Sequence, residues 1–308
     1  MKNTITKISL FIVMLIGLNT YAQYRFEFGM SAGVANYLGD IGGGDKTRRD
    51  FIFDMKMAKS RQAVSGFIRY KVLPGLSLKA ELTYLRISGD DALSANPARH
   101  LRNLNFTNDM FELATQAQIK IYEDPSINSS KRFKIGMRAY IGGGIGAFYS
   151  NPKTKFNGGS VALRPLETEG VSYGAMGICI PVSGGVAFTL KKHHRIGWEI
   201  GWRTTFTDYL DDVSTVYANG LTGTSADLAN RTGEVADAES YGIDLANYGP
   251  SDNGTLNKRG DPTHNDSYLT MNISYSYVFR GQSAFYRSKY GSFFSKTAKK
   301  GRKIRAKF

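Results

Sequence analysis

The acidic side chains of one long segment are the residues of this 308-residue chain with the clearest potential for chemistry. The segment from Tyr209 to Asp266 holds ten aspartate and glutamate residues against three basic ones, which gives it a formal charge near −7. Carboxylate oxygens bind calcium, and Asp211-Asp212, Asp252-Asn253-Gly254 and Asp261 would supply them. None of these stretches has the twelve-residue spacing of an EF-hand, so the sequence does not predict an ordered calcium ion.

The four histidines are the next candidates. His193-His194 are adjacent, and neighbouring side chains of an extended chain point apart, so we expect both imidazoles to be solvated rather than to share a metal. His100 and His264 lie in expected external loops, with Ser94 and Ser267 near them in sequence. Barrel enzymes that act on lipids use such residues, but no spacing here indicates a catalytic triad. The sequence therefore predicts no catalytic residue, no cofactor and no metal.

The N-terminus predicts export. Lys2 and Lys7 form a basic region, the 11 residues from Ile8 to Leu18 are apolar, and Thr20-Tyr21-Ala22 offers small residues for cleavage. The apolar region is too short to cross a bilayer as a helix, which needs about 20 residues. We expect residues 1–22 to be a signal peptide and the mature chain to start at Gln23, with an uncleaved anchor as the alternative.

Eight later segments alternate apolar and polar residues, which is typical of transmembrane β-strands because their lipid and lumen faces alternate. A competing uncharged stretch, residues 170–190, is long enough for a transmembrane helix, but five glycines and Pro181 oppose helix formation. The only cysteine, Cys179, lies in this stretch and is expected to be a small buried residue. The eight predicted strands are residues 24–34, 64–72, 76–84, 111–121, 133–147, 176–188, 196–206 and 269–279.

The polar faces of these strands favour a membrane barrel over a soluble sandwich, because they carry charges of both signs that could pair across a narrow lumen. These charges are Arg25, Glu27, Arg69, Lys71, Lys79, Glu81, Glu112, Lys120, Arg138, Glu199 and Arg203. Short connections (73–75, 123–132, 191–195) alternate with long ones (36–61, 87–106, 150–172, 209–266). Residues 23–281 are therefore predicted to form an all-β, eight-stranded antiparallel barrel of the outer membrane, with long extracellular loops and both ends in the periplasm.

Residues 282–308 are predicted to be a basic periplasmic tail with nine basic and no acidic residues. One interpretation is a solvated tail that at most touches anionic lipid head groups. The other is a docking element for an acidic periplasmic partner, since aromatic and arginine residues dominate interface hot spots. An exported barrel meets no nucleic acid. The candidate partner-binding residues are Arg287, Lys289, Tyr290, Phe293, Phe294, Lys296, Lys299, Lys300, Arg302, Lys303, Arg305 and Lys307.

Three stretches together carry a family resemblance: Tyr37 to Gly43 (YLGDIGG), Thr207 to Ser214 (TDYLDDVS), and Gly260-Asp261-Pro262 with Asn265-Asp266. The chain resembles the PorG-like outer-membrane β-barrel family of the type IX secretion and gliding machinery. The resemblance implies a non-enzymatic component of a protein secretion complex that docks on a periplasmic ring lipoprotein and its partner, within outer-membrane lipids. A small passive porin is the alternative, and a lipid-modifying enzyme is the third hypothesis.

Overall fold

The computed structural model describes residues 26–42, 57–73, 75–94, 96–123, 135–191, 193–236, 238–242, 244–250 and 256–279. The predicted signal peptide and the predicted basic tail lie outside these residues. Within them, no helix is both long and apolar enough to cross a membrane.

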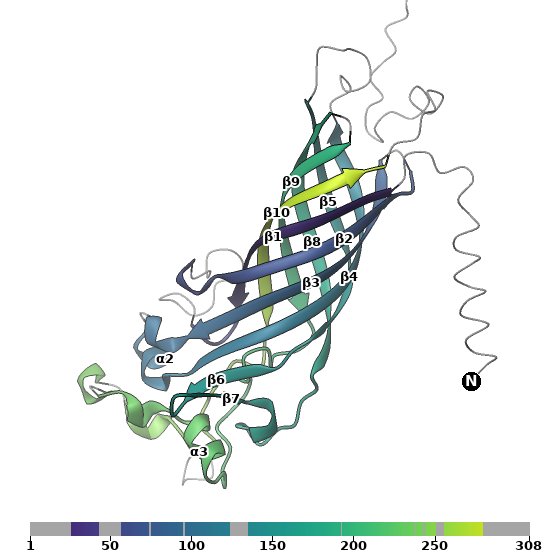
Figure 1. Cartoon of the computed structure of the whole chain (residues 1–308). Coiled ribbons are helices and arrows are strands. Elements are labelled where there is room, and N and C mark those ends of the chain that lie inside the picture. The colour runs from purple at the N-terminus through teal and green to yellow at the C-terminus, as the bar shows by residue number, and fades with distance from the viewer. Residues whose placement is uncertain are drawn as a thin grey trace, which may run out of the picture.

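Eight strands form a closed antiparallel barrel (Figure 1). They are β1 (Phe26–Leu38), β2 (Arg61–Lys71), β3 (Leu76–Asp90), β4 (Asn105–Glu123), β5 (Ile135–Tyr149), β8 (Met176–Leu190), β9 (His194–Thr205) and β10 (Ser267–Val278). The first strand pairs with the last, from Glu27 opposite Val278 to Leu38 opposite Ser267, and this pairing completes the ring. The predicted fold is confirmed, and the stretch that competed as a helix is strand β8.

The outward face of the barrel is apolar. Met30 is 68% exposed and Ile273 is 66% exposed, and the outward residues of the other strands are similar. Most inward residues in the middle and at the periplasmic end of the barrel are polar and buried. Closed antiparallel barrels with an apolar outer surface span bacterial outer membranes, because closure leaves no unpaired backbone in the hydrocarbon. The protein is therefore an outer-membrane β-barrel, and its short turns mark the periplasmic end.

Aromatic rings gather at the periplasmic ends of β1 and β10, at the level where aromatic girdles meet the lipid head groups. The ring of Phe28 packs edge-on against Phe279, with centroids 5.4 Å apart. His193 stacks on Tyr277 at 5.5 Å, and His194 Nδ1 lies 2.7 Å from the hydroxyl of Tyr275. Both histidines are partly exposed, and the rings of β10 on which they pack were not expected from the sequence.

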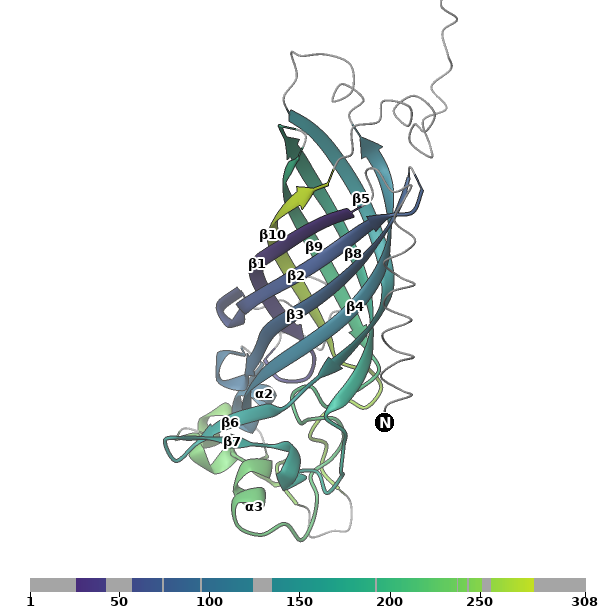
Figure 2. The ribbon, with the colours of Figure 1, turned by 45° about the vertical axis from the view of Figure 1, so that its right-hand side comes forward.

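The long connections are far more structured than the sequence indicated. Strands β3 and β4 continue to Asp90 and from Asn105, so most of the predicted loop 87–106 is strand and short helix. The predicted loop 150–172 contains a hairpin that extends the sheet beside β4. These added elements gather at the extracellular end (Figures 1 and 2). They are β6 (Pro152–Phe156), β7 (Gly159–Ala162), α2 (Pro97–Arg102), α3 (Thr224–Ala229) and the 3-10 turns Met57–Lys59, Asp91–Leu93, Arg164–Leu166, Thr232–Glu234, Ala238–Tyr241 and Leu245–Asn247.

These connections build an apolar core inside the extracellular end of the barrel, and we call the whole assembly the cap. Inward residues of the upper strands, such as Leu85 and Met110, are apolar here and fully buried. They pack in one cluster with Leu210 and Val213 from the long β9–β10 connection. Cys179 belongs to the same buried cluster, as predicted. The extracellular mouth of the barrel is therefore filled by a hydrophobic core rather than open to water.

Candidate functional site

The lumen of the barrel is the first candidate site, because its walls bring many charged side chains together. Near the periplasmic end, Glu27 on β1 binds Arg69 through one carboxylate oxygen and Arg195 through the other. The hydroxyl of Ser276 also donates to Glu27 Oε1 at 2.7 Å. One buried carboxylate thus joins strands β2, β9 and β10.

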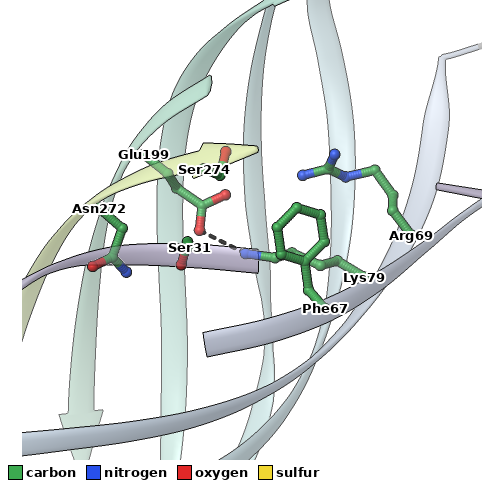
Figure 3. Close-up of a pocket in the computed structure, with 7 residues that line it drawn as sticks. All are labelled: Ser31, Phe67, Arg69, Lys79, Glu199, Asn272 and Ser274. Atoms are coloured by element: carbon green, nitrogen blue, oxygen red, sulfur yellow. Dashed lines mark hydrogen bonds and ion pairs between the residues drawn. The ribbon is translucent and has the colours of Figure 1, made fainter. Parts of the chain in front are cut away.

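The middle of the lumen is crossed by Lys79. Its Nζ lies 2.9 Å from Glu81 Oε2 on its own strand and 2.8 Å from Glu199 Oε1 on β9, which stands on the opposite wall (Figure 3). The hydroxyl of Tyr140 donates to the other oxygen of Glu199 at 2.7 Å. The void left beside these groups is about 10 Å³, lined by Ser31, Phe67, Arg69, Lys79, Glu199, Asn272 and Ser274. A void of that size holds about one water molecule.

A third buried pair stands below the cap. Arg203 Nε lies 3.3 Å from Glu112 Oε2, and the hydroxyl of Tyr268 donates to the same oxygen. Arg203 also approaches Glu81 at 4.0 Å, which links this pair to the middle layer. Seven of the charged residues predicted to face the lumen therefore form ion pairs inside it, and together with Arg195 we call this set the lumen network: Glu27, Arg69, Lys79, Glu81, Glu112, Glu199 and Arg203.

The second candidate site lies in the cap, where the three stretches that carry the family resemblance meet. The hydroxyl of Tyr37 lies 2.6 Å from both Asp211 Oδ2 and Asp266 Oδ1. The backbone N–H of Ile41 donates to Asp211 at 3.1 Å, and that of Asp261 donates to Asp40 Oδ2 at 2.7 Å. We call this group the motif cluster. Residues more than 200 positions apart in the chain are held together there.

Burial and mutual repulsion set the protonation of the motif cluster. Burial raises the pKa of Asp211 well above its usual range, and the neighbouring charges of Asp266 and Asp40 raise it further. Burial likewise raises the pKa of Asp266 well above its usual range, with added repulsion from Asp208 and Asp40. Both shifts favour the neutral carboxyl, because charge is costly in a dry site and next to a like charge.

Two arginines bind the connections of the cap to one another. Arg102 Nε binds Asp91 at 2.7 Å, while its two Nη atoms donate to the carbonyl of Arg259 at 2.5 Å and to that of Asp40 at 2.7 Å. Arg259 Nη1 binds Glu169 at 3.0 Å and the carbonyl of Asp212 at 2.6 Å. These buried guanidinium groups satisfy loop carbonyls that would otherwise have no partner.

The acidic segment 209–266 is therefore not simply a solvated negative loop. Asp211, Asp212 and Asp266 are buried, and burial raises the pKa of Asp212 although Arg259 opposes the shift. Among the described residues, no group of three or more His, Cys, Asp or Glu side chains could hold a metal ion. These acidic residues instead accept hydrogen bonds within the cap.

The other sequence candidates have these positions. His100 packs against Tyr241 with ring centroids 5.2 Å apart. His264 Nδ1 lies 2.8 Å from the hydroxyl of Thr263 and 3.3 Å from Asp261. The proposed partner-binding residues, Arg287 to Lys307, lie outside the described residues.

The ion pairs in the lumen were predicted from the sequence, whereas the motif cluster was missed. Its only sequence signal is that each of the three stretches that carry the family resemblance contains an aspartate of the cluster.

Comparison with known proteins gives the following matches. A family model described as "Domain of unknown function (DUF6089)" matches residues 6–221. No curated protein matches the sequence. The crystal structure of Neisserial surface protein A is 7% identical with a TM-score of 0.39, covering 82% of this chain and 97% of that one. The outer membrane protein OprG from Pseudomonas aeruginosa is 9% identical with a TM-score of 0.38, covering 84% and 99%. Ail, the attachment invasion locus protein of Yersinia pestis, is 7% identical with a TM-score of 0.34, covering 84% and 100%.

Proposed function

The chain belongs to the DUF6089 family, and from that premise we propose that it is a non-enzymatic docking barrel of a protein secretion complex rather than a pore. In this proposal the barrel is an anchor in outer-membrane lipids. Its basic tail binds periplasmic partners, and the secretion system is of the type IX, PorG-like kind that the sequence resembles.

The filled lumen is the observation that carries the proposal. Three linked layers of buried charges occupy it from Glu27 up to Glu112, and the apolar core of the cap lies above them. Breaking a buried ion pair leaves charges without partners, which costs about 3–5 kcal/mol. Passage of a hydrated solute would break several such pairs. This argues against a passive small-solute porin, which is the alternative function.

The motif cluster supports the secretion role. The stretches around Tyr37, Asp211 and Asp266 are those by which the sequence resembles the PorG-like family, and buried hydrogen bonds join them. Hydrogen bonds between these residues join connections of the cap that are far apart in the sequence. A stable extracellular cap and a separate basic periplasmic tail suit a protein that is held between partners and catalyses no reaction.

The test is deletion of Ser283 to Phe308. We expect the truncated protein to insert in the membrane and to keep heat-modifiable migration on gels, because β10 ends at Val278 and already closes the sheet. It should lose co-purification with a periplasmic ring lipoprotein and its partner, and it should fail to restore secretion in a deletion strain.

A matched variant distinguishes docking through aromatic side chains from an effect of the positive charge alone. The triple substitution Tyr290→Ala, Phe293→Ala and Phe294→Ala keeps all nine basic residues of the tail. If the tail docks through aromatic anchors, this variant loses the partners as the truncation does. If the truncated protein restores secretion fully, the docking role is wrong, and the tail is a solvated or lipid-contacting segment.

A further inference from the structure

The periplasmic end of the lumen network has more cations than carboxylates. Glu27 has both oxygens occupied, one by Arg69 and one by Arg195. A third arginine, Arg138 on β5, interacts electrostatically with all three of these residues. Three guanidinium groups therefore surround a single carboxylate, and the local charge is positive.

Arg138 is the arginine of this group that forms no ion pair with a carboxylate of the described residues. Its exposed fraction is only 8%, and its Nε is buried with no hydrogen-bond partner among the described residues. Its guanidinium carbon lies 5.1 Å from the ring centroid of Tyr140. The guanidinium carbon of Arg69 lies 5.3 Å from the same ring, so one aromatic ring contacts two cations.

The carboxylates nearby are already bound to other cations. Glu199 accepts from Lys79 and Tyr140, and Glu81 accepts from Lys79 and Ser65. Glu123, which lies opposite Arg138 in the β4–β5 pairing, is bound by Lys120. Glu123 interacts with Arg138 electrostatically, but within the described part of the chain no carboxylate forms an ion pair with Arg138.

A buried guanidinium without a partner is costly, and a bound anion would offset that cost. Arginine presents a planar fork of N–H donors that matches the oxygens of phosphate and carboxylate groups. Arg138 lies near the periplasmic end of β5, while the cap closes the other end of the lumen. Any ligand would thus enter from the periplasm.

We propose that Arg138, flanked by Arg69 and Arg195, forms an oxyanion site in the periplasmic mouth of the barrel that takes a phosphate group. The phosphate comes either from free inorganic phosphate or from the head group of an inner-leaflet lipid. The site is independent of the docking role, because it lies within the barrel wall and uses no residue of the tail.

The test is calorimetric titration of the full-length protein, purified in a detergent free of phosphate, with inorganic phosphate at constant ionic strength set by chloride. We expect saturable binding to the wild type and at least tenfold weaker binding to Arg138→Met, which keeps a similar stem without the charge. Arg138→Lys keeps the charge but not the fork and should bind with intermediate affinity. Arg61→Met, which removes an arginine at the extracellular end of β2, should bind as the wild type does.

Thermal unfolding gives a readout that does not depend on the calorimeter. Phosphate should raise the unfolding midpoint of the wild type and of Arg61→Met, since a ligand that binds only the folded state stabilises it. The midpoint of Arg138→Met in chloride should be no lower than that of the wild type, because the substitution removes an uncompensated cation.

A second titration, with short-chain phosphatidylglycerol in the same micelles, distinguishes the two sources. Saturation by inorganic phosphate indicates the free anion, and saturation only by the lipid indicates the head group. Absence of binding by both ligands to the wild type, or equal binding to the wild type and Arg138→Met, would overturn the proposal.

Discussion

Asp211 and Asp266 share one hydroxyl group, that of Tyr37, and each carboxyl oxygen lies 2.6 Å from it. A hydroxyl has a single proton and can donate it to only one of the two. The second carboxyl makes a hydrogen bond at that distance by carrying a proton and donating it. The buried pair therefore retains a proton at a pH at which exposed aspartates are ionised, in agreement with the raised pKa of both groups.

Removal of that hydroxyl should loosen the cap and leave the barrel intact. Tyr37→Phe leaves two buried carboxyl oxygens without the partner that joins them, and each unsatisfied buried group costs about 1–3 kcal/mol. We expect faster proteolysis of the segment 207–266 and unchanged heat-modifiable migration of the barrel. Unchanged proteolysis would show that the shared hydroxyl does not hold the cap.

The stability of the cap should fall as the pH rises. The folded pKa of Asp211 and Asp266 is raised above that of an unfolded aspartate, which is about 3.9. Between these two values the folded cap binds more protons than the unfolded chain, so its stability decreases with pH until the folded pKa is passed. The free energy of opening, from hydrogen exchange at residues 208–214, should decrease from pH 5 to pH 8.

Two controls accompany that measurement. Asp211→Asn cannot ionise and should flatten the pH dependence. Amides of the central β2 strand, near Ser65, should show no such trend because they lie away from the motif cluster. An opening free energy that increases with pH would contradict the assignment of a retained proton.

The strands, their lumen and lipid faces and the buried Cys179 could be predicted from the sequence. Successive side chains of a strand point to opposite faces, so the alternation of apolar and polar residues shows which face each residue occupies. The cap could not be predicted in this way. The contacts of Tyr37 with Asp211 and Asp266 join positions that no local pattern relates, and an aspartate in a loop resembles any solvated one until its neighbours are known. The ring contacts of His193 and His194 were missed for the same reason, since the tyrosines on which they pack belong to β10.

Loss of a carboxylate should destabilise the barrel much more at Glu27 than at the rim of the lumen. Glu27→Gln removes the one negative charge between Arg69 and Arg195, and loss of a buried partner costs about 3–5 kcal/mol. Glu123→Gln removes the partly exposed partner of Lys120, and such pairs contribute about 0–1 kcal/mol. Urea unfolding in lipid bilayers measures both. Equal losses of unfolding free energy in the two variants would show that the ion pairs of Glu27 stabilise the barrel no more than that of Glu123.

A glycine in β5 should be essential for barrel assembly. A Cβ added at Gly144 would lie 1.9 Å from the carbonyl oxygen of Thr115 and 2.7 Å from the Cα of Gln116, both backbone atoms of β4. Gly144→Ala should therefore reduce the yield of folded, heat-modifiable barrel. Gly66→Ala is the matched control, because a Cβ there meets nothing within 4 Å, and it should assemble normally. Normal assembly of both variants would contradict the tight packing of β4 against β5.

Ion conductance of the purified full-length protein in a planar lipid bilayer tests the central claim most directly. Because buried ion pairs fill the lumen and an apolar core closes the cap, we expect no steady conductance at neutral pH in moderate salt. Glu27→Gln, examined in parallel, shows whether loss of one layer alone opens a path, and we expect at most brief openings because the other layers and the cap remain. A large, steady conductance from the wild-type protein would contradict the closed lumen and favour a porin.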